Sequence, residues 1–271
     1  GQDTAFIIEG VQGPMARSVR DCALFLDAMS GFDPQIAISY PAPKIPYQEA
    51  VIRAEGKLKI AFAPDLGGFG QVDPEMAQHL ASVMQQLEKN GARIEETCPD
   101  LSHLEQSYHT LRGLMWATAA RRLPPEVQAH FKSTLAENTA FGQALTLEDI
   151  VDANLNRSTL FNNMLSLFET FDVLACPTVG CMPHVSSEEW VQRVGGVELT
   201  NYMDWLRFAF LATTTGLPAI SVPVGRGPRG LPVGLQLIGK PRGEAALLAA
   251  ARQVELTFGG PLGPIDPINP S

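Results

Sequence analysis

Apolar side chains recur every three or four positions in the N-terminal part of the chain, and polar residues mark the start of each run. Ser18 opens the first run in a Ser-x-x-Asp pattern that is typical of a capping box, and Gly31 follows the run. A second run begins after Asp73, with Pro and Glu next in the chain, and ends before Gly91. The spacing predicts one amphipathic helix from Ser18 and another over 73–90.

Two short segments on either side of the second helix are predicted to be strands. They comprise residues 58–62, which are followed by a glycine-rich loop at 64–70, and residues 93–97. A strand, a helix and a strand in succession favour parallel pairing of the two strands. Residues 34–49 are rich in proline, so we expect an irregular connection there.

The chain changes character between about 101 and 170, where helical periodicity dominates. One helix is predicted around Leu104 and Tyr108, and a second is predicted after Pro125. A third helix begins at the capping box that Thr146 opens. We interpret 101–170 as a mainly helical insertion that covers one side of a sheet.

Patterns typical of strands return in the C-terminal part of the chain. Residues 172–176 predict a strand, 178–200 a loop, and 203–212 a helix. Two apolar strands follow within 215–225 and 230–239, joined by a Gly/Pro turn and leading into a last helix rich in Glu, Ala and Leu. This order of elements predicts an α/β fold. We expect the proline-rich tail to lie over the surface.

The composition is that of an ordinary globular protein. Of the 271 residues, 45% are hydrophobic and 18% are charged, which is too apolar for a disordered chain. The net charge of -9 and the scattered Lys and Arg residues argue against a nucleic-acid partner. No apolar run reaches the roughly 18 residues that span a bilayer, and no signal-peptide pattern is visible. We therefore expect a cytoplasmic protein without a membrane partner.

Cysteine and histidine spacings do not indicate a metal site. The four cysteines match no zinc pattern, so we expect free thiols, and the five histidines show no H-E-x-x-H or paired spacing. The glycine-rich residues 67–70 lack the Gly-Lys-Ser/Thr of a phosphate-binding loop. We expect neither a metal nor a cofactor.

One pair of adjacent serines, Ser186 and Ser187, is a possible nucleophile. Glu188 and Glu189 follow the pair, and two carboxylates oppose a developing oxyanion. His184 precedes Ser186 by two positions, but proximity in a loop does not establish a Ser-His pair. The chain also has no G-x-S-x-G elbow. We interpret the pair as non-catalytic.

Several segments, in the right order, resemble the amidase signature hydrolases. The similarity extends over essentially the whole chain, and the segments that carry it are 13–21, 63–75, 171–178 and 216–239. The first of these reads Gly-Pro-Met-Ala-Arg-Ser-Val-Arg-Asp. The resemblance implies that residues 1–271 are the C-terminal portion of one amidase domain, and that the fold is part of an α/β/α sandwich with a mixed sheet.

The resemblance also implies amide hydrolysis by a serine nucleophile, with a second serine that relays the proton and a lysine that acts as the base. A neutral buried amine accepts a proton near neutral pH, and backbone N–H groups of a glycine-rich loop stabilise the oxyanion. The chain contains neither a Gly-Gly-Ser-Ser-Gly-type segment nor a later glycine-rich serine strand. We therefore expect no catalytic residue in this chain, a nucleophile upstream of it, and no turnover by the chain alone.

Three residues are candidates for contact with a substrate. Thr178 follows a strand, where α/β sheets place ligand contacts. Gln236 alternates with Leu235 and Leu237, so its amide faces away from them and needs a partner, for which we expect an active-site loop. Trp205 is a candidate for the lining of an acyl pocket, although an aromatic residue on a helix more often belongs to the core.

Two classes of function remain open. The chain is either the C-terminal portion of an amidase that acts on a small-molecule amide, or a non-enzymatic scaffold or partner subunit derived from an amidase. In both cases an incomplete domain leaves unpaired strand edges and apolar surface. We therefore expect association with an N-terminal half or with another copy of the chain.

Overall fold

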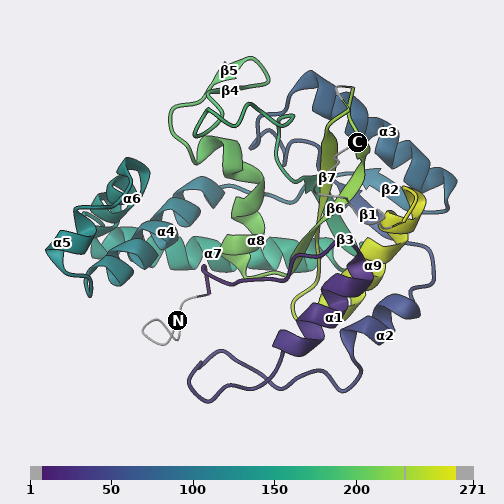
Figure 1. Ribbon diagram of the computed structural model, residues 1–271, viewed down its shortest axis with the longest axis horizontal. Coiled ribbons are helices and arrows are strands. Elements are labelled where there is room, and N and C mark those ends of the chain that lie inside the picture. The colour runs from purple at the N-terminus through teal and green to yellow at the C-terminus, as the bar shows by residue number, and fades with distance from the viewer. Residues whose placement is uncertain (1–7, 229, 261–271) are drawn as a thin grey trace, which may run out of the picture.

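The computed structural model describes residues 8–228 and 230–260, and there a five-stranded sheet lies between two layers of helices (Figure 1). The strand order is β2-β1-β3-β7-β6. β1 pairs in parallel with β2 and β3, whereas β7 pairs antiparallel with β3 and β6. The sheet is therefore mixed, and the parallel pairing expected for β1 and β2 is confirmed. The strands are β1 Lys59–Phe62, β2 Arg93–Glu96, β3 Val173–Pro177, β6 Ala219–Arg226 and β7 Pro232–Ile238.

On one face of the sheet, alternate strand residues such as Ile60 and Leu235 form one apolar core with residues of four helices. Ser18 caps the first helix, because its Oγ accepts a hydrogen bond of 3.0 Å from the backbone N–H of Asp21. The helix start predicted at Ser18 is thus confirmed. The four helices are α1 Val19–Met29, α2 Tyr47–Ile52, α3 Pro74–Lys89 and α9 Glu244–Thr257.

The other face packs against α4, α7, α8 and the 3₁₀ helix η2, with Leu174 and Ile238 in the core between them. α5 and α6 extend this helical layer beyond the edge of the sheet (Figure 1). None of the helices described combines the length and the apolar character that crossing a bilayer requires. The elements of this layer are α4 Leu104–Ala120, α5 Pro125–Gln128, α6 Ser133–Gln143, α7 Leu147–Leu167, η2 Asp204–Ala209 and α8 Phe210–Thr215.

The structure corrects three local predictions. The short helix α2 begins inside the segment expected to be irregular. A hairpin of β4 (Arg193–Val194) and β5 (Val197–Glu198) lies within the predicted loop at 178–200. The predicted helix at 203–212 begins as the 3₁₀ helix η2 before it becomes α8. These elements are too short for a periodic pattern to distinguish them. The predicted surface position of the tail concerns residues 261–271, which lie outside the described part of the chain.

The helices α4 and α6 approach each other closely where two glycines meet. A Cβ atom on Gly142 of α6 would lie 1.9 Å from the carbonyl oxygen of Gly113 in α4 and 2.4 Å from its carbonyl carbon. Both atoms belong to a helix backbone, which cannot move aside as a flexible side chain does. The absence of a side chain at Gly142 therefore sets the distance between the two helices.

We predict that Gly142→Ala destabilises the protein by about 1–3 kcal/mol, because the added methyl group forces α4 and α6 apart. Alanine is the better helix former by about 1 kcal/mol, so helix propensity alone gives the opposite sign. Urea unfolding measures the difference. Gly31→Ala is the control, because a Cβ atom there has no neighbour within 4 Å. Equal stability of the two variants would contradict the prediction.

Candidate functional site

The second helical layer does not cover the whole of its sheet face. Along β6 that face is exposed. Ser221 of β6 stands opposite Gln236 of β7, which stands opposite Cys176 of β3, so the three residues share this face. On β6, Ala219, Ser221 and Pro223 are exposed, whereas the residues that alternate with them point into the opposite core. These three residues and the neighbouring Thr178 form what we call the uncovered strip. Among the described strands, β6 has β7 as its one partner, so its outer edge is open.

Two hydroxyl groups meet on the uncovered strip. The Oγ1 of Thr178 and the Oγ of Ser221 lie 2.7 Å apart, and either can donate the hydrogen bond. Gly234 of β7 lies between the two side chains, and a Cβ atom on Gly234 would lie 2.8 Å from each of the two oxygens. Glycine at this position therefore allows the side chains from β3 and β6 to reach each other across β7.

Gln236 lies beside this pair and is buried. Its Nε2 donates to the backbone carbonyl of Phe208 in η2 at 2.7 Å and to the Sγ of Cys176 at 3.1 Å. Leu235 and Leu237 pack on the opposite face of the sheet, so the predicted orientation of the amide is confirmed. Within the described residues the amide nitrogen bonds to η2, and its expected contact with an active-site loop stays a prediction.

The cysteine thiols near this face are protonated at neutral pH. Burial raises the pKa of Cys176 to about 12 and the pKa values of Cys98 and Cys181 to about 11. All three thiols are free, as is Cys22. A buried thiol with a raised pKa is a poor nucleophile, so Cys176 and Cys98 serve the packing of the core over the sheet and Cys181 that of a smaller cluster.

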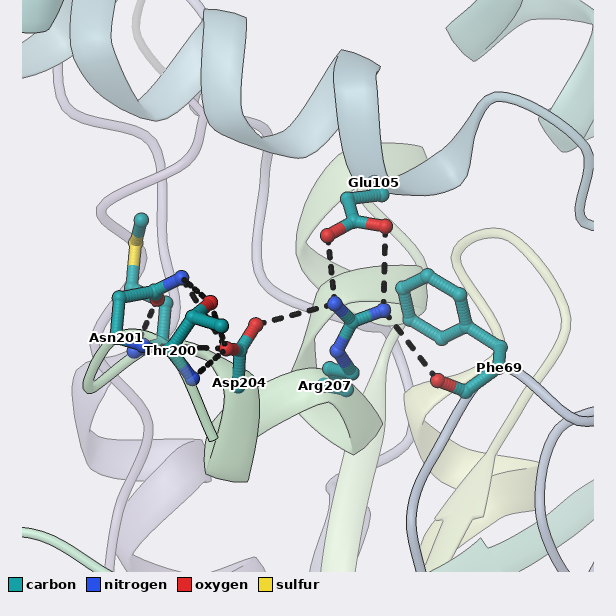
Figure 2. A network of polar contacts seen from close by, with 7 residues as sticks. Phe69, Glu105, Thr200, Asn201, Asp204 and Arg207 are labelled. Carbon is teal, nitrogen blue, oxygen red and sulfur yellow. Dashed lines mark hydrogen bonds and ion pairs between the residues drawn. The ribbon is translucent and has the colours of Figure 1, made fainter. Parts of the chain in front are cut away.

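A network of polar contacts fixes η2 against α4 (Figure 2). Arg207 of η2 forms a bidentate ion pair with Glu105 of α4, with N–O distances of 2.6 and 3.2 Å. The same guanidinium donates to Asp204 at 3.1 Å and to the carbonyl of Phe69 at 3.5 Å. These contacts join η2, α4 and the loop after β1. They hold the segment that carries the Phe208 carbonyl.

Asp204 anchors the start of η2. Its Oδ2 accepts hydrogen bonds from the backbone N–H and the hydroxyl of Thr200, both at 2.9 Å, and from Asn201. Burial pushes the pKa of Asp204 upward, but the hydrogen bonds from Thr200, Arg207 and Asn201 outweigh it and leave the pKa below its ordinary value. The carboxylate is therefore ionised and acts as a fixed acceptor.

Trp205 is not part of the uncovered strip but of a neighbouring apolar cluster that also includes Val179, the residue after Thr178. It packs against a small cluster of Cys181, Val191 and Val194, and its ring meets the ring of His184 edge-on at 5.8 Å. Ser186 and Ser187, which follow His184, are exposed. Of the three predicted substrate contacts, the structure brings Thr178 and Gln236 together on one sheet face and places Trp205 with the β4–β5 hairpin.

The site supplies hydrogen-bond donors and acceptors but no activated nucleophile. The partner that the structure gives the Ser221 hydroxyl is Thr178, which is not a base. Between residues 8 and 260, omitting 229, no three His, Cys, Asp or Glu side chains are grouped so as to hold a metal ion. Ser221 was not predicted as a site residue; its alternation with Ile220 and Val222 separates it from their face, but its place beside Gln236 follows only from the strand register.

We predict that Gln236→Leu destabilises the protein by about 1–3 kcal/mol, because the buried Phe208 carbonyl loses its side-chain donor. Gln253→Leu is a matched control, since that amide makes an exposed contact of 3.3 Å with the carbonyl of Glu55. We expect the control to change stability by about 0.5 kcal/mol or less. Urea unfolding of both variants measures the two changes. A Gln236 variant that is as stable as the control would contradict the stabilising role of the hydrogen bond to Phe208.

His109 of α4 is a partly buried titratable side chain. Its ring meets Phe210 and Tyr108 edge-on, and burial lowers its pKa below the ordinary value of 6.5. As the pH falls below 6.5, the unfolded chain binds a proton that the folded state does not bind until lower pH. The stabilisation is thus complete above pH 6.5 and is lost as the pH falls toward the folded pKa.

We therefore predict that His109→Asn gives a flatter dependence of unfolding free energy on pH between about 7 and 5. The difference in slope stays below ~1.4 kcal/mol per pH unit, the value for one full proton. Urea unfolding of both proteins at several pH values measures it. Parallel profiles of variant and original protein would show that His109 is not responsible.

Comparison with known proteins identifies the family of this chain. A family model described as Amidase matches residues 4–248. A putative amidase of Synechocystis is 28% identical over 92% of this chain, and an acylamidase of Rhodococcus erythropolis is 29% identical over 90% of it. A glutamyl-tRNA(Gln) amidotransferase subunit of Moorella thermoacetica is also 29% identical over 90% of the chain. These matches cover 47%, 51% and 53% of the respective relatives, so the chain spans about half of their length.

The fold agrees with this placement. A bacterial aryl acylamidase of the amidase signature family superposes with a TM-score of 0.80 at 24% identity, over 95% of this chain and 57% of that one. A 6-aminohexanoate cyclic dimer hydrolase superposes with a TM-score of 0.74 over 90% of this chain and 54% of that one. The α/β fold with its mixed sheet is therefore the fold of these enzymes, and the chain belongs to the amidase signature family.

Proposed function

We propose that this chain is the C-terminal portion of an amidase domain and that its uncovered strip forms one wall of the substrate pocket. The observation that carries the proposal is the open β6 edge beside the Thr178–Ser221 hydroxyl pair. A sheet face that carries polar groups and is left uncovered by its own helices is suited to contact with another segment or a ligand. The extent of the match, about half of each relative, supports the same interpretation.

The reaction we propose is hydrolysis of the C–N bond of a small-molecule amide. We propose, from the resemblance to the family, that the serine nucleophile, the relaying serine and the lysine base lie on polypeptide upstream of Gly1. In this arrangement the hydroxyls of Thr178 and Ser221 orient the substrate by hydrogen bonds, and Gln236 holds η2 in place behind them. Trp205 stays a candidate for the acyl pocket only if the upstream polypeptide extends that pocket to the β4–β5 hairpin.

We predict that the 271-residue chain alone releases no ammonia from simple aliphatic or aromatic amides, because a hydroxyl without a base is not activated. Ammonia release is measured directly, with an intact relative such as an acylamidase as the positive control. Turnover that persists through repurification and scales with the amount of chain would overturn the proposal.

The hydroxyl pair gives a second measurement once an upstream half is supplied as a separate polypeptide. Thr178→Val and Ser221→Ala each remove about 1 kcal/mol of hydrogen bonding, so each lowers kcat/KM of the assembled enzyme about fivefold to tenfold. Thr139→Val is the control, because that hydroxyl is buried in α6 and donates to the Leu135 carbonyl. If all three variants had the same kcat/KM, the two hydroxyls would not contact the substrate, and the prediction would be wrong.

The alternative is a non-enzymatic scaffold or partner subunit derived from an amidase. The open β6 edge favours association in either case, and one relative is named as one subunit of an amidotransferase. The reading frame upstream of Gly1 discriminates between the two functions, because the amidase requires a lysine and a glycine- and serine-rich tract there. Intact mass and size-exclusion chromatography of the native gene product show its length and its association state.

A further inference from the structure

A small cavity lies between the segment that precedes α1 and the helices α4 and α8, away from the uncovered strip. Its volume is about 10 Å³, and Glu9, Arg112 and Thr214 contribute to its lining. A space of about 10–15 Å³, counted as the volume open to the centre of a water molecule, holds one water. The cavity is therefore just large enough for one water molecule.

Two of the residues that line this cavity carry a polar atom without a partner among the described protein atoms. Thr214 is 1% exposed, and its Oγ1 is buried without a hydrogen bond. The next residue, Thr215, behaves differently, because its hydroxyl donates to the Leu211 carbonyl at 2.6 Å. The Nε of Arg112 is likewise buried without an acceptor, although its Nη2 donates to Tyr202 at 2.7 Å. Such groups cost about 1–3 kcal/mol each when nothing satisfies them.

The third polar group at the cavity is an anion. The side chain of Glu9 is 10% exposed and pairs with the Nη2 of Arg157 on α7 at 3.1 Å. The Nε of Arg157 in turn donates to the backbone carbonyl of Thr214 at 3.2 Å. Glu9, Arg157 and Thr214 are thus held together, and Glu9 and Arg112 line the same small space.

We propose that this cavity is the binding site of one water molecule that joins Arg112, Thr214 and Glu9. The water accepts a hydrogen bond from the Arg112 Nε–H, donates one to the Glu9 carboxylate and shares one with the Thr214 hydroxyl. Three bonds of this kind are typical of buried waters. A bound cation would be repelled by Arg112 and an anion by Glu9, whereas a neutral donor and acceptor satisfies all three groups.

The bound water would connect the chain before α1 to two helices of the second layer. The ion pair with Arg157 adds α7 to the same junction. This inference does not depend on the proposed amidase function, because it rests on the cavity and its lining residues and is tested by protein stability and electron density. Its failure would therefore leave the assignment of the pocket wall untouched.

Thr214→Val in the full chain tests the site, because valine keeps the shape of threonine and removes the hydroxyl. If the Thr214 hydroxyl bonds to a water molecule, its removal costs the stabilisation from that hydrogen bond. We therefore expect Tm to fall by about 2–4 °C. Thr215→Val is the matched control. Its hydroxyl makes an i−4 bond to a helix carbonyl, which adds little to stability, so we expect a change of about 1 °C or less. A Thr214 variant with a Tm equal to or above that of the control would overturn the proposal.

A crystal structure of the unmodified chain provides the second measurement and does not depend on the folding of a variant. The expected result is one density peak within hydrogen-bond distance of both Thr214 Oγ1 and Arg112 Nε. Absence of density there, or density that belongs to a protein atom, would equally refute the water site.

Discussion

The hydrogen bond from Gln236 to the Phe208 carbonyl is the constraint on which the site depends. Gln236 is a buried polar side chain on a sheet face that otherwise packs with apolar residues, so its amide must be satisfied inside the protein. The segment η2 provides the acceptor, and the ion pair between Arg207 and Glu105 fixes η2 to α4. The helical layer is therefore held over β3 and β7, while the same face of β6 stays open beside it.

The parts of this arrangement that depend on local chemistry could be predicted from the sequence. The cap at Ser18, the helix after Asp73 and the apolar alternation around Gln236 each follow from neighbours in the chain, and the structure has them where expected. The partner of Gln236 could not be predicted, because it lies 28 positions away in a 3₁₀ helix and offers a backbone carbonyl, which no residue type reveals. The contact between Thr178 and Ser221 was missed for a related reason, since it depends on the registers of two strand pairs and on a glycine between them.

Trp205 illustrates the limit of reasoning from residue type. A tryptophan near a suspected pocket is an attractive pocket residue, because its large apolar ring suits an acyl group. In the structure it packs with Cys181, Val191 and Val194, and Val194 lies in a hairpin of two-residue strands that gave no periodic signal in the sequence. The hairpin within the expected loop at 178–200 was missed for the same reason, because strands of two residues are too short for an alternating pattern to show.

The wall of the proposed pocket offers hydrogen bonds but no group that can act as a base. Arg207 is bound by Glu105 and Asp204, and Arg157 is bound by Glu9, so these guanidinium groups are engaged by carboxylates of the same chain. What the uncovered strip presents instead is a pair of neutral hydroxyls, which can orient an amide but cannot remove a proton from a nucleophile. Under the proposed function, binding and activation are thus divided between two parts of one domain. The part described here then has reason to be rigid, because a wall that shifts by about 1 Å loses much of the rate that positioning contributes.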